Sequence, residues 1–326
     1  MYGPDGIAVV SLIGCLMKEK KQYLYGPVPS RRLGRSLGVD LIPYKVCTYD
    51  CVYCQLGRTT NKTMERREWV PTGAVVAQLK EKLASKPDYI TLAGSGEPTL
   101  HAEIGSLIHE IKSLTDIPVA VITNGSLLWL PEVRESLADA DLVVPSLDAG
   151  SEDMFNYVNR PHWQIPFDQM LNGLREFRRS FRGRYWLEVF LLSGVTTVES
   201  RVQALRDCIE AISPDKVQVN TVVRPPAEGY ATPVPHEQMA QIAAQLHPQA
   251  EVIVPYSHLD DKDSSGMGCI EVLGLLSRRP CSIADVARGL RLHPHEAAKC
   301  VARLVFQQKV RAQEHEGILY YEAILS

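Results

Sequence analysis

The chain has 326 residues, which is enough for about two domains at roughly 150 residues each. It is 45% hydrophobic and 22% charged, a balance that is typical of a folded globular protein and too apolar for a disordered one. The 35 Lys and Arg against 38 Asp and Glu give a net charge of −3, so the overall charge does not indicate a nucleic-acid-binding protein. No run of about 18 apolar residues is present, so we expect no membrane span and a cytoplasmic protein.

Residues 1–22 are expected to form an N-terminal extension. Met1–Gly6 carries neither Lys nor Arg, so the apolar stretch Ile7–Met17 lacks the basic flank of a secretory signal. Met17 precedes a run of charged residues and is a second possible start of the chain. The folded part is therefore expected to begin at Tyr23.

Residues 23–256 alternate short β-branched or aromatic runs with longer stretches of helical periodicity, which indicates parallel strands joined by helical crossovers. The expected strands are Leu37–Ile42, Tyr89–Ala93, Pro118–Thr123, Asp141–Pro145, Trp186–Leu191 and Lys216–Asn220, with Glu251–Val254 as an extra edge strand. The expected helices are Gly73–Leu83, Ala102–Leu114, Pro131–Ala138, Pro166–Ser180, Glu199–Ile212 and His236–Leu246. Six repeats predict an α/β fold, a partial (β/α)6 barrel of the TIM type.

Polar or glycine-containing segments follow five of the expected strands. They are Gly94–Glu97, Asn124-Gly125, Ser146–Asp148, Ser193-Gly194 and Asn220-Thr221. Each segment alone is typical of a helix cap or a turn. Because the loops that follow the strands of such a barrel share one face, the five segments together predict a site at its mouth.

Residues 257–268 are polar and glycine-containing, and they are expected to link the barrel to a second domain at residues 269–326. The elements expected there are helices at Ile270–Leu276, Ile283–Gly289 and Pro294–Gln307 and a hairpin of Lys309–Gln313 with Ile318–Ala323. They predict a small α+β domain of the winged-helix type, with the helix from Pro294 as recognition helix. Eight Lys or Arg against six Asp or Glu in residues 266–326 leave nucleic-acid contact and protein docking equally open.

Cys47, Cys51 and Cys54 form a C-x3-C-x2-C motif directly after the first expected strand. Three thiolates on one short loop can hold three corners of a cubane iron–sulfur cluster and leave the fourth iron open to a reactant. Zinc is the alternative, but a structural zinc site needs four ligands, and the only histidine nearby downstream is His101. The cysteines from Cys208 onward are scattered and are expected to be buried thiols.

The cysteine triad, with Tyr53 just before its last cysteine, resembles the radical S-adenosylmethionine (radical SAM) superfamily. The resemblance covers about Tyr23 to Val254. It implies a 4Fe–4S cluster and S-adenosylmethionine as cofactors, with the amino and carboxylate groups of S-adenosylmethionine on the open iron. It also implies reductive cleavage to methionine and a 5′-deoxyadenosyl radical, and a reductant such as flavodoxin or ferredoxin.

The segment Gly94–Thr99 reads GSGEPT and is similar to the GGE-type motif of the superfamily, which receives the ammonium group of methionine. The resemblance implies that Asn124 lies near the methionine carboxylate or the ribose, and that the ribose contacts lie after the fourth strand. The expected cofactor-binding residues are Tyr53, Gly96, Glu97, Asn124, Ser146, Asp148 and Glu188.

Charged residues near the expected site have more than one interpretation. Glu188 lies in an apolar strand, where an unpaired carboxylate is costly, so it either faces the barrel mouth or pairs with a base. The segment Asn159–His162 either reaches the mouth or forms a turn. Seven basic residues flank the cysteine loop, and they either clamp an anionic substrate such as RNA phosphates, contact the S-adenosylmethionine carboxylate or form a solvated face. They are Arg31, Arg32, Arg35, Arg58, Lys62, Arg66 and Arg67.

Within the superfamily, Tyr25–Asp40 and Cys51–Gly57 are most similar to the wyosine-synthase-related branch. Characterised members rebuild a methylated guanine in tRNA and hold a second cluster on three upstream cysteines, whereas this chain has only Cys15 there. The expected function is therefore a radical SAM enzyme that acts on an unidentified small molecule, tRNA base or nucleoside. The alternatives are an activase that places a glycyl radical on a partner protein, and an iron–sulfur redox-sensing winged-helix regulator.

Overall fold

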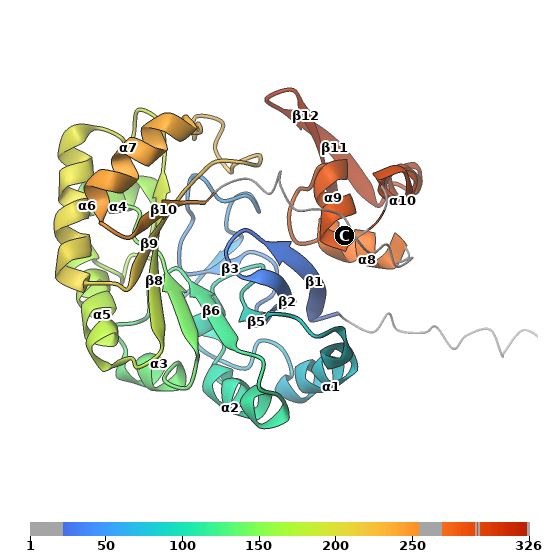
Figure 1. Cartoon of the computed structure of the whole chain (residues 1–326), viewed down its shortest axis with the longest axis horizontal. Helices are drawn as coiled ribbons and strands as arrows, with labels where there is room; N and C mark the ends of the chain where they lie inside the picture. The colour runs from blue at the N-terminus through green and yellow to red at the C-terminus, as the bar shows by residue number, and fades with distance from the viewer. Residues whose placement is uncertain (1–21, 254–268, 291, 293, 325–326) are drawn as a thin grey trace, which may run out of the picture.

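The computed structural model describes residues 22–253, 269–290, 292 and 294–324. They form a curved sheet flanked by helices, followed by a smaller unit of helices and a hairpin (Figure 1). The predicted linker at residues 257–268 lies outside the described residues, as do residues 1–21 of the predicted N-terminal extension and Val254 of the predicted edge strand.

A sheet of eight strands forms the framework of the first part, in the order β1-β2-β5-β6-β7-β8-β9-β10. Six consecutive parallel strands of this order correspond to the six predicted ones: β2 (Gly34–Val39), β5 (Tyr89–Leu92), β6 (Val119–Thr123), β7 (Leu142–Pro145), β8 (Arg184–Leu191) and β9 (Lys216–Thr221). The strand β10 (Ala250–Val252) pairs in parallel with β9 at the predicted edge. The strands β1 and β10 lie at opposite ends of this order and do not pair with each other. The sheet is therefore open, as a partial barrel requires.

The helices lie along the outer, convex side of the sheet (Figure 1). They are α1 (Thr72–Lys82), α2 (Ile104–Leu114), α3 (Pro131–Ser136), α5 (Phe167–Ser180), α6 (Glu199–Ile212) and α7 (His236–Leu246). In α5, Met170, Leu174 and Phe177 recur at helical spacing and are buried against the sheet. No helix within the described residues has both the length and the apolar character needed to cross a membrane.

The sequence did not predict β1 (Leu24–Ser30), the short strands β3 (Val46–Cys47) and β4 (Asn61–Lys62), or the two-turn helix α4 (Glu152–Val158). The strand β1 contains two prolines, which argue against a strand inside a sheet. It pairs antiparallel with β2 at the edge of the sheet, where a missing N–H can face away from the ladder.

The second part contains the predicted helices and hairpin: α8 (Cys269–Leu276), α9 (Ile283–Leu290), α10 (Pro294–Phe306), β11 (Val310–His315) and β12 (Ile318–Ala323). Its core includes Val272, Val286 and Val301, and Val28 of β1 is buried in the same cluster. The edge strand β1 therefore belongs to the packing of both parts. The winged-helix assignment and the recognition role of the helix from Pro294 stay predictions.

Polar contacts also join the C-terminal domain to the barrel. Arg278 forms an ion pair with Asp40 at 2.6 Å, and its guanidinium lies 4.3 Å from the ring centre of Tyr25. The hydroxyl of Tyr320 donates to the backbone carbonyl of Val223 at 2.9 Å. The domain is thus held against the barrel at both α8 and β12.

Replacing Arg278 by glutamine is expected to loosen this contact. The Arg278 and Asp40 side chains are only 12% and 11% exposed, so the change leaves a nearly buried carboxylate without its cation and costs about 2 kcal/mol. Backbone amides of α8 and β1 should then exchange hydrogen faster. Arg311→Gln is the matched control, because the Arg311 side chain that pairs with Glu322 is exposed to solvent. This variant should leave the exchange of these amides unchanged. Equal exchange in both variants would contradict the role of Arg278.

Candidate active site

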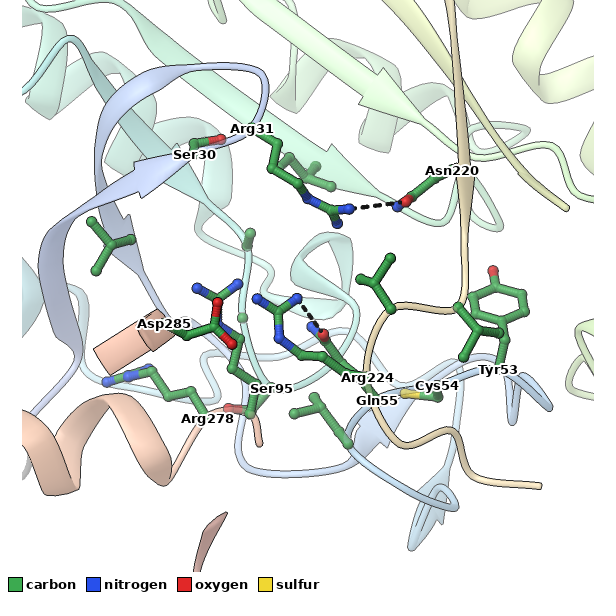
Figure 2. Close-up of a pocket in the computed structure, with 18 of the residues that line it drawn as sticks. Ser30, Arg31, Tyr53, Cys54, Gln55, Ser95, Asn220, Arg224, Arg278 and Asp285 are labelled. Atoms are coloured by element: carbon green, nitrogen blue, oxygen red, sulfur yellow. Dashed lines mark hydrogen bonds between the residues drawn. The ribbon is translucent and has the colours of Figure 1, made fainter. Parts of the chain in front are cut away.

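A cavity of about 1010 Å³ lies at the carboxyl ends of the parallel strands, with the C-terminal domain as its outer wall (Figure 2). Four of the five polar segments predicted to meet at the mouth contribute to its lining, namely those that follow β5, β6 and β7 and the one that ends β9. The fifth, Ser193-Gly194, does not line it, since the Gly194 amide donates to Thr197 Oγ1 at 3.1 Å just before α6. That segment is the turn that its composition also allowed.

The three cysteines of the triad line this cavity from one loop, and all three are partly exposed. Buried Tyr49 and Val52 anchor the loop between the cysteines. The backbone amide of Val52 donates to the carbonyl of Val158 at 2.9 Å, and that of Asp50 to the carbonyl of Asn159 at 3.0 Å. The backbone of the loop is therefore fixed at the wall of the cavity.

Each thiol of the triad has one nitrogen donor from another segment. The contacts are Lys45 Nζ to Cys54 Sγ at 3.3 Å, Asn124 Nδ2 to Cys47 Sγ at 3.6 Å, and Asn159 Nδ2 to Cys51 Sγ at 3.5 Å. Such donors orient sulfur ligands and stabilise negative charge on them. Sequence reasoning placed Asn124 in the site and left Asn159 open, but it missed Lys45, which carries no motif.

The donor chemistry of the triad fits an iron–sulfur cluster. Burial and the nearby Glu97 carboxylate raise the pKa of Cys47 to about 12, so a bound cation is needed to hold this sulfur as a thiolate. In the part of the chain that the structure describes, no three His, Cys, Asp or Glu side chains are grouped as ligands of one metal ion. A cubane cluster makes a different demand, because each cysteine binds its own iron.

Glu97 is the most heavily hydrogen-bonded side chain of the site. It is 2% exposed, and its carboxylate accepts four hydrogen bonds from the segments after β5 and β6. The donors are Thr99 N at 3.0 Å, Thr99 Oγ1 at 2.6 Å, Thr123 Oγ1 at 2.5 Å and Asn124 N at 2.7 Å. Burial raises the pKa of Glu97, and these donors partly offset it. The carboxylate is thereby fixed at the cavity wall.

The serine that replaces a glycine in the GSGEPT segment has a structural role. Ser95 Oγ donates to Asp40 Oδ2 at 2.6 Å, and the Ser95 amide donates to Oδ1 at 3.1 Å. The same Asp40 carboxylate pairs with Arg278. Gly96, in contrast, must be a glycine, because a Cβ there would lie 1.9 Å from the carbonyl oxygen of Val46. The motif thus packs directly on the cysteine loop and is linked to the C-terminal domain.

Asp148 lies 3% exposed at the cavity wall and organises the side chains around it. Its carboxylate accepts hydrogen bonds from the Tyr53 hydroxyl, from Asn159 Nδ2 at 2.7 Å and from the Phe190 amide at 3.0 Å. Burial raises its pKa to about 6. The Tyr53 ring stacks on Phe190 with 3.9 Å between ring centres. Sequence reasoning placed Tyr53, Ser146 and Asp148 at the mouth but did not foresee this network.

Glu188 both pairs with a base and lines the cavity, so the two interpretations of this residue hold together. Its carboxylate forms an ion pair with Arg32 at 2.6 Å and accepts from Asn220 Nδ2 at 2.9 Å. Burial alone would raise the pKa of Glu188, but the Arg32 guanidinium and the Asn220 amide outweigh it and lower the pKa below its usual value. Glu188 is therefore ionised at neutral pH.

Replacing Arg32 by glutamine is expected to reverse the pH dependence that Glu188 gives to stability. In the native chain the lowered pKa adds stability above pH 4.5, and this is lost as the pH falls through the folded-state pKa. Without Arg32, burial raises the pKa of Glu188 above its value in the unfolded chain. The variant therefore loses stability as the pH rises through that unfolded-state pKa. Urea unfolding should show a loss of about 3 kcal/mol at pH 7 that shrinks toward pH 4. A loss independent of pH would contradict this account.

Of the seven basic residues that flank the cysteine loop, only Arg31 and Arg32 line the cavity. The others have partners elsewhere: Arg58 pairs with Glu228 at 3.0 Å, and Arg66 Nε donates to the carbonyl of Thr99 at 3.0 Å. Five of the seven thus do not line the cavity, and the clamp for an anionic substrate stays a prediction. Four arginines that sequence reasoning did not select complete the basic lining: Arg224, Arg278, Arg279 and Arg288.

Comparison with known proteins agrees with the fold and the site. The sequence profile of the Radical SAM superfamily matches residues 41–208. A Brachyspira hyodysenteriae protein called GTPase Obg is 39% identical over 93% of this chain, which spans only 45% of that protein. A UPF0026 protein of Helicobacter pylori (strain J99) is 31% identical over 94% of this chain and 99% of its own length.

A solved radical SAM methyltransferase from Sphaerobacter thermophilus has a similar fold, with a TM-score of 0.51 at 18% identity over 67% of this chain and 66% of that one. The chain therefore belongs to the radical SAM superfamily, whose enzymes use a 4Fe–4S cluster and S-adenosylmethionine. Within it, the chain is a member of the UPF0026 proteins. This confirms the superfamily predicted from the sequence, while the wyosine-synthase-related branch stays a prediction.

Proposed function

We propose that this enzyme holds a 4Fe–4S cluster on Cys47, Cys51 and Cys54 and removes a hydrogen atom from a substrate bound in the adjoining cavity. The observation that supports this most directly is that the three cysteines and residues Gly94–Glu97 line one cavity. When bound and reduced, the cluster supplies the electron that cleaves S-adenosylmethionine to methionine and a 5′-deoxyadenosyl radical.

The residues around the cluster loop have distinct roles in this proposal. Glu97, fixed by its four donors, accepts the ammonium group of the methionine moiety. Asn124 holds its side chain between Thr48 and the Cys47 sulfur and meets the methionine carboxylate or the ribose. Ser146 offers its hydroxyl to the ribose, and Asp148 fixes Tyr53 and Asn159 beside it.

The C-terminal domain excludes water from the reaction. Residues of α9 and β12 line the cavity opposite the cysteine loop, and a hydrogen-abstracting site must keep out solvent and stray hydrogen donors. The buried contacts of Val28 and Arg278 hold this wall in place.

The substrate that we propose first is a tRNA base or a nucleoside-derived small molecule. Wyosine-synthase relatives, which the Tyr25–Asp40 segment resembles, act on a tRNA base. A flavodoxin or ferredoxin supplies the electrons, and the compartment is the cytoplasm, which keeps thiols reduced. The C-terminal domain provides the surface for a nucleic-acid or protein partner. A glycyl-radical activase and a redox-sensing regulator are the alternative functions.

Cleavage of S-adenosylmethionine tests the proposal. The full chain is reconstituted anaerobically with iron and sulfide, reduced with dithionite and supplied with S-adenosylmethionine, and 5′-deoxyadenosine is measured by mass spectrometry. We expect product from the wild type and background from Cys51→Ala. Equal, background product from both proteins, with four irons per wild-type chain confirmed, would overturn the proposal.

A further inference from the structure

Three arginines in the cavity form no direct ion pair, although Glu188 lies near Arg31, and Asp285 lies near Arg224 and Arg279. Arg31 Nη1 donates to Asn220 Oδ1 at 3.2 Å, and Arg224 Nη1 donates to Gln55 Oε1 at 3.4 Å, so both bind neutral groups. Arg279 lines the same cavity. Across residues 22–253, 269–290, 292 and 294–324, no Asp or Glu oxygen lies within 4.0 Å of these three guanidinium groups. Their charge is therefore uncompensated by direct ion pairs.

The three arginines come from different parts of the fold and meet in one space. Arg31 lies in the turn between β1 and β2, Arg224 in the segment after β9, and Arg279 in the C-terminal domain between α8 and α9. Figure 2 shows the guanidinium groups of Arg31 and Arg224 projecting into the cavity between the barrel and the C-terminal domain. Besides burial, repulsion from Arg224 and Arg32 lowers the pKa of Arg31 to about 10, which requires these cations to be close.

This arrangement is costly unless an anion completes it. Arg224 has a buried Nε with no hydrogen-bond partner, and a buried donor without an acceptor costs about 1–3 kcal/mol. Among the described residues, seven basic and four acidic side chains line the cavity, an excess of basic groups. The other basic side chains have acceptors of their own: Arg32 has Glu188, Arg278 has Asp40, Arg288 has Asp285, and Lys45 faces the Cys54 sulfur. Among the described lining residues, the three arginines are therefore the basic side chains without a direct ion pair or a sulfur contact, and they share the longer-range field of Asp285 with Arg288.

Phosphate is the anion that matches this geometry best. A guanidinium binds two oxygens of an anion in a fork, and arginine is the residue most suited to phosphate for this reason. Guanidinium groups from three segments can bind the free oxygens of a phosphate, of which a monoester offers three and a phosphodiester of RNA offers two. The cavity of about 1010 Å³ has room for a nucleotide-sized group beside the cysteine loop.

We propose that Arg31, Arg224 and Arg279 form a subsite for a phosphate group of the substrate, so that the substrate is a nucleotide, either free or within RNA. This rests on the proposed function for the position of the reacting atoms, but the subsite itself does not depend on it. Because Arg279 belongs to the C-terminal domain, phosphate binding also fastens that domain to the barrel.

Calorimetric titration of the unreduced, cluster-reconstituted full chain tests the subsite. The probes are inorganic phosphate, the four nucleosides, their 5′-monophosphates, a short RNA hairpin, and citrate as a carboxylate. We expect one of two results. Either at least one monophosphate binds at least about tenfold more tightly than its nucleoside, or the hairpin binds and none of the free nucleotides does. The first result assigns a free nucleotide and the second an RNA phosphate. No binding of any phosphate probe, or tighter binding of citrate, would overturn the proposal.

Charge-removing variants locate the phosphate. Arg224→Gln and Arg279→Gln should each weaken the best phosphate probe at least about tenfold, and Arg224→Lys should weaken it less. Arg179→Gln is the matched control, because Arg179 is 66% exposed on α5, and it should change the affinity less than about twofold. An equal effect of Arg179→Gln would show general charge screening and overturn the proposal. If a glutamine variant unfolds, binding can still be compared between the wild type and Arg224→Lys. The measurement is the rise in melting temperature that phosphate causes in each protein.

Titration with S-adenosylmethionine separates this subsite from the cofactor site. Arg224→Gln and Arg279→Gln should bind S-adenosylmethionine within about twofold of the wild type, whereas a parallel loss of affinity would assign the arginines to the cofactor and overturn the proposal. Because these titrations need no reduction or turnover, they can succeed even if the wild type forms no 5′-deoxyadenosine. Failure of the subsite and failure of the proposed function are thus distinguished.

Discussion

Cys51→Ala is expected to abolish cluster binding and the cleavage of S-adenosylmethionine. Losing even a residue that only orients a metal ligand costs about 10–100-fold in affinity or activity, so losing one of three ligands should cost more than about a hundredfold. The remaining two thiols leave two irons without protein ligands. Iron content and 5′-deoxyadenosine formation should therefore fall together to background in this variant.

Cys208→Ala is the matched control for the loss of a thiol. Cys208 is buried in α6, and its sulfur lies 3.9 Å from the carbonyl oxygen of Gly150, away from the cavity lining. The control variant should keep its iron and its 5′-deoxyadenosine formation within about twofold of the wild type. Normal iron content in Cys51→Ala, or equal losses in the two variants, would contradict the assignment of the triad.

Gly96→Ala is expected to destabilise the chain by about 3 kcal/mol and to weaken S-adenosylmethionine binding. The added Cβ would meet the carbonyl oxygen of Val46 at 1.9 Å and Ile42 Cγ2 at 2.6 Å, and the backbone carbonyl cannot rotate away. Relief requires the Gly94–Thr99 segment to move off the cysteine loop, which also displaces Glu97. Urea unfolding and cofactor titration measure the two effects.

Gly73→Ala provides the comparison for this change. Gly73 lies exposed in the first turn of α1, and a Cβ there would meet nothing within 4 Å. Because alanine restricts the unfolded chain and favours a helix, this variant should keep or gain about 0.5 kcal/mol of stability. If Gly96→Ala is as stable as Gly73→Ala and binds S-adenosylmethionine normally, the close packing of the motif on the cysteine loop is not required.

The repeating strands and helices of the barrel could be predicted because local sequence pattern determines them. The helices at Glu199–Ile212 and His236–Leu246 were predicted with the bounds that the structure shows, since their apolar residues recur at helical spacing and alternate with apolar strands. The cysteine triad and the GSGEPT segment were recognisable because both are contiguous in the chain.

Features that depend on distant residues could not be predicted in this way. In the network of Asp148 with Tyr53 and Asn159, the hydrogen bond between Tyr53 and Asp148 joins residues 95 positions apart, and no local pattern encodes it. The pairing of Arg278 with Asp40 spans 238 positions. The arginines of the cavity became distinguishable only once the fold separated them from basic residues such as Arg58, which has an acidic partner. Proximity to the cysteine loop in the sequence selected Arg31 and Arg32 but not the other arginines that line the cavity.

Binding of S-adenosylmethionine to the cluster held by Cys47, Cys51 and Cys54 is the step on which the proposed chemistry depends. Its most direct test is electron–nuclear double resonance on the reduced, reconstituted chain with S-adenosylmethionine labelled at the amino nitrogen and the carboxylate oxygens. We expect hyperfine coupling from both labels to the cluster. A fully loaded, reduced cluster that shows no coupling to either label would contradict this binding mode.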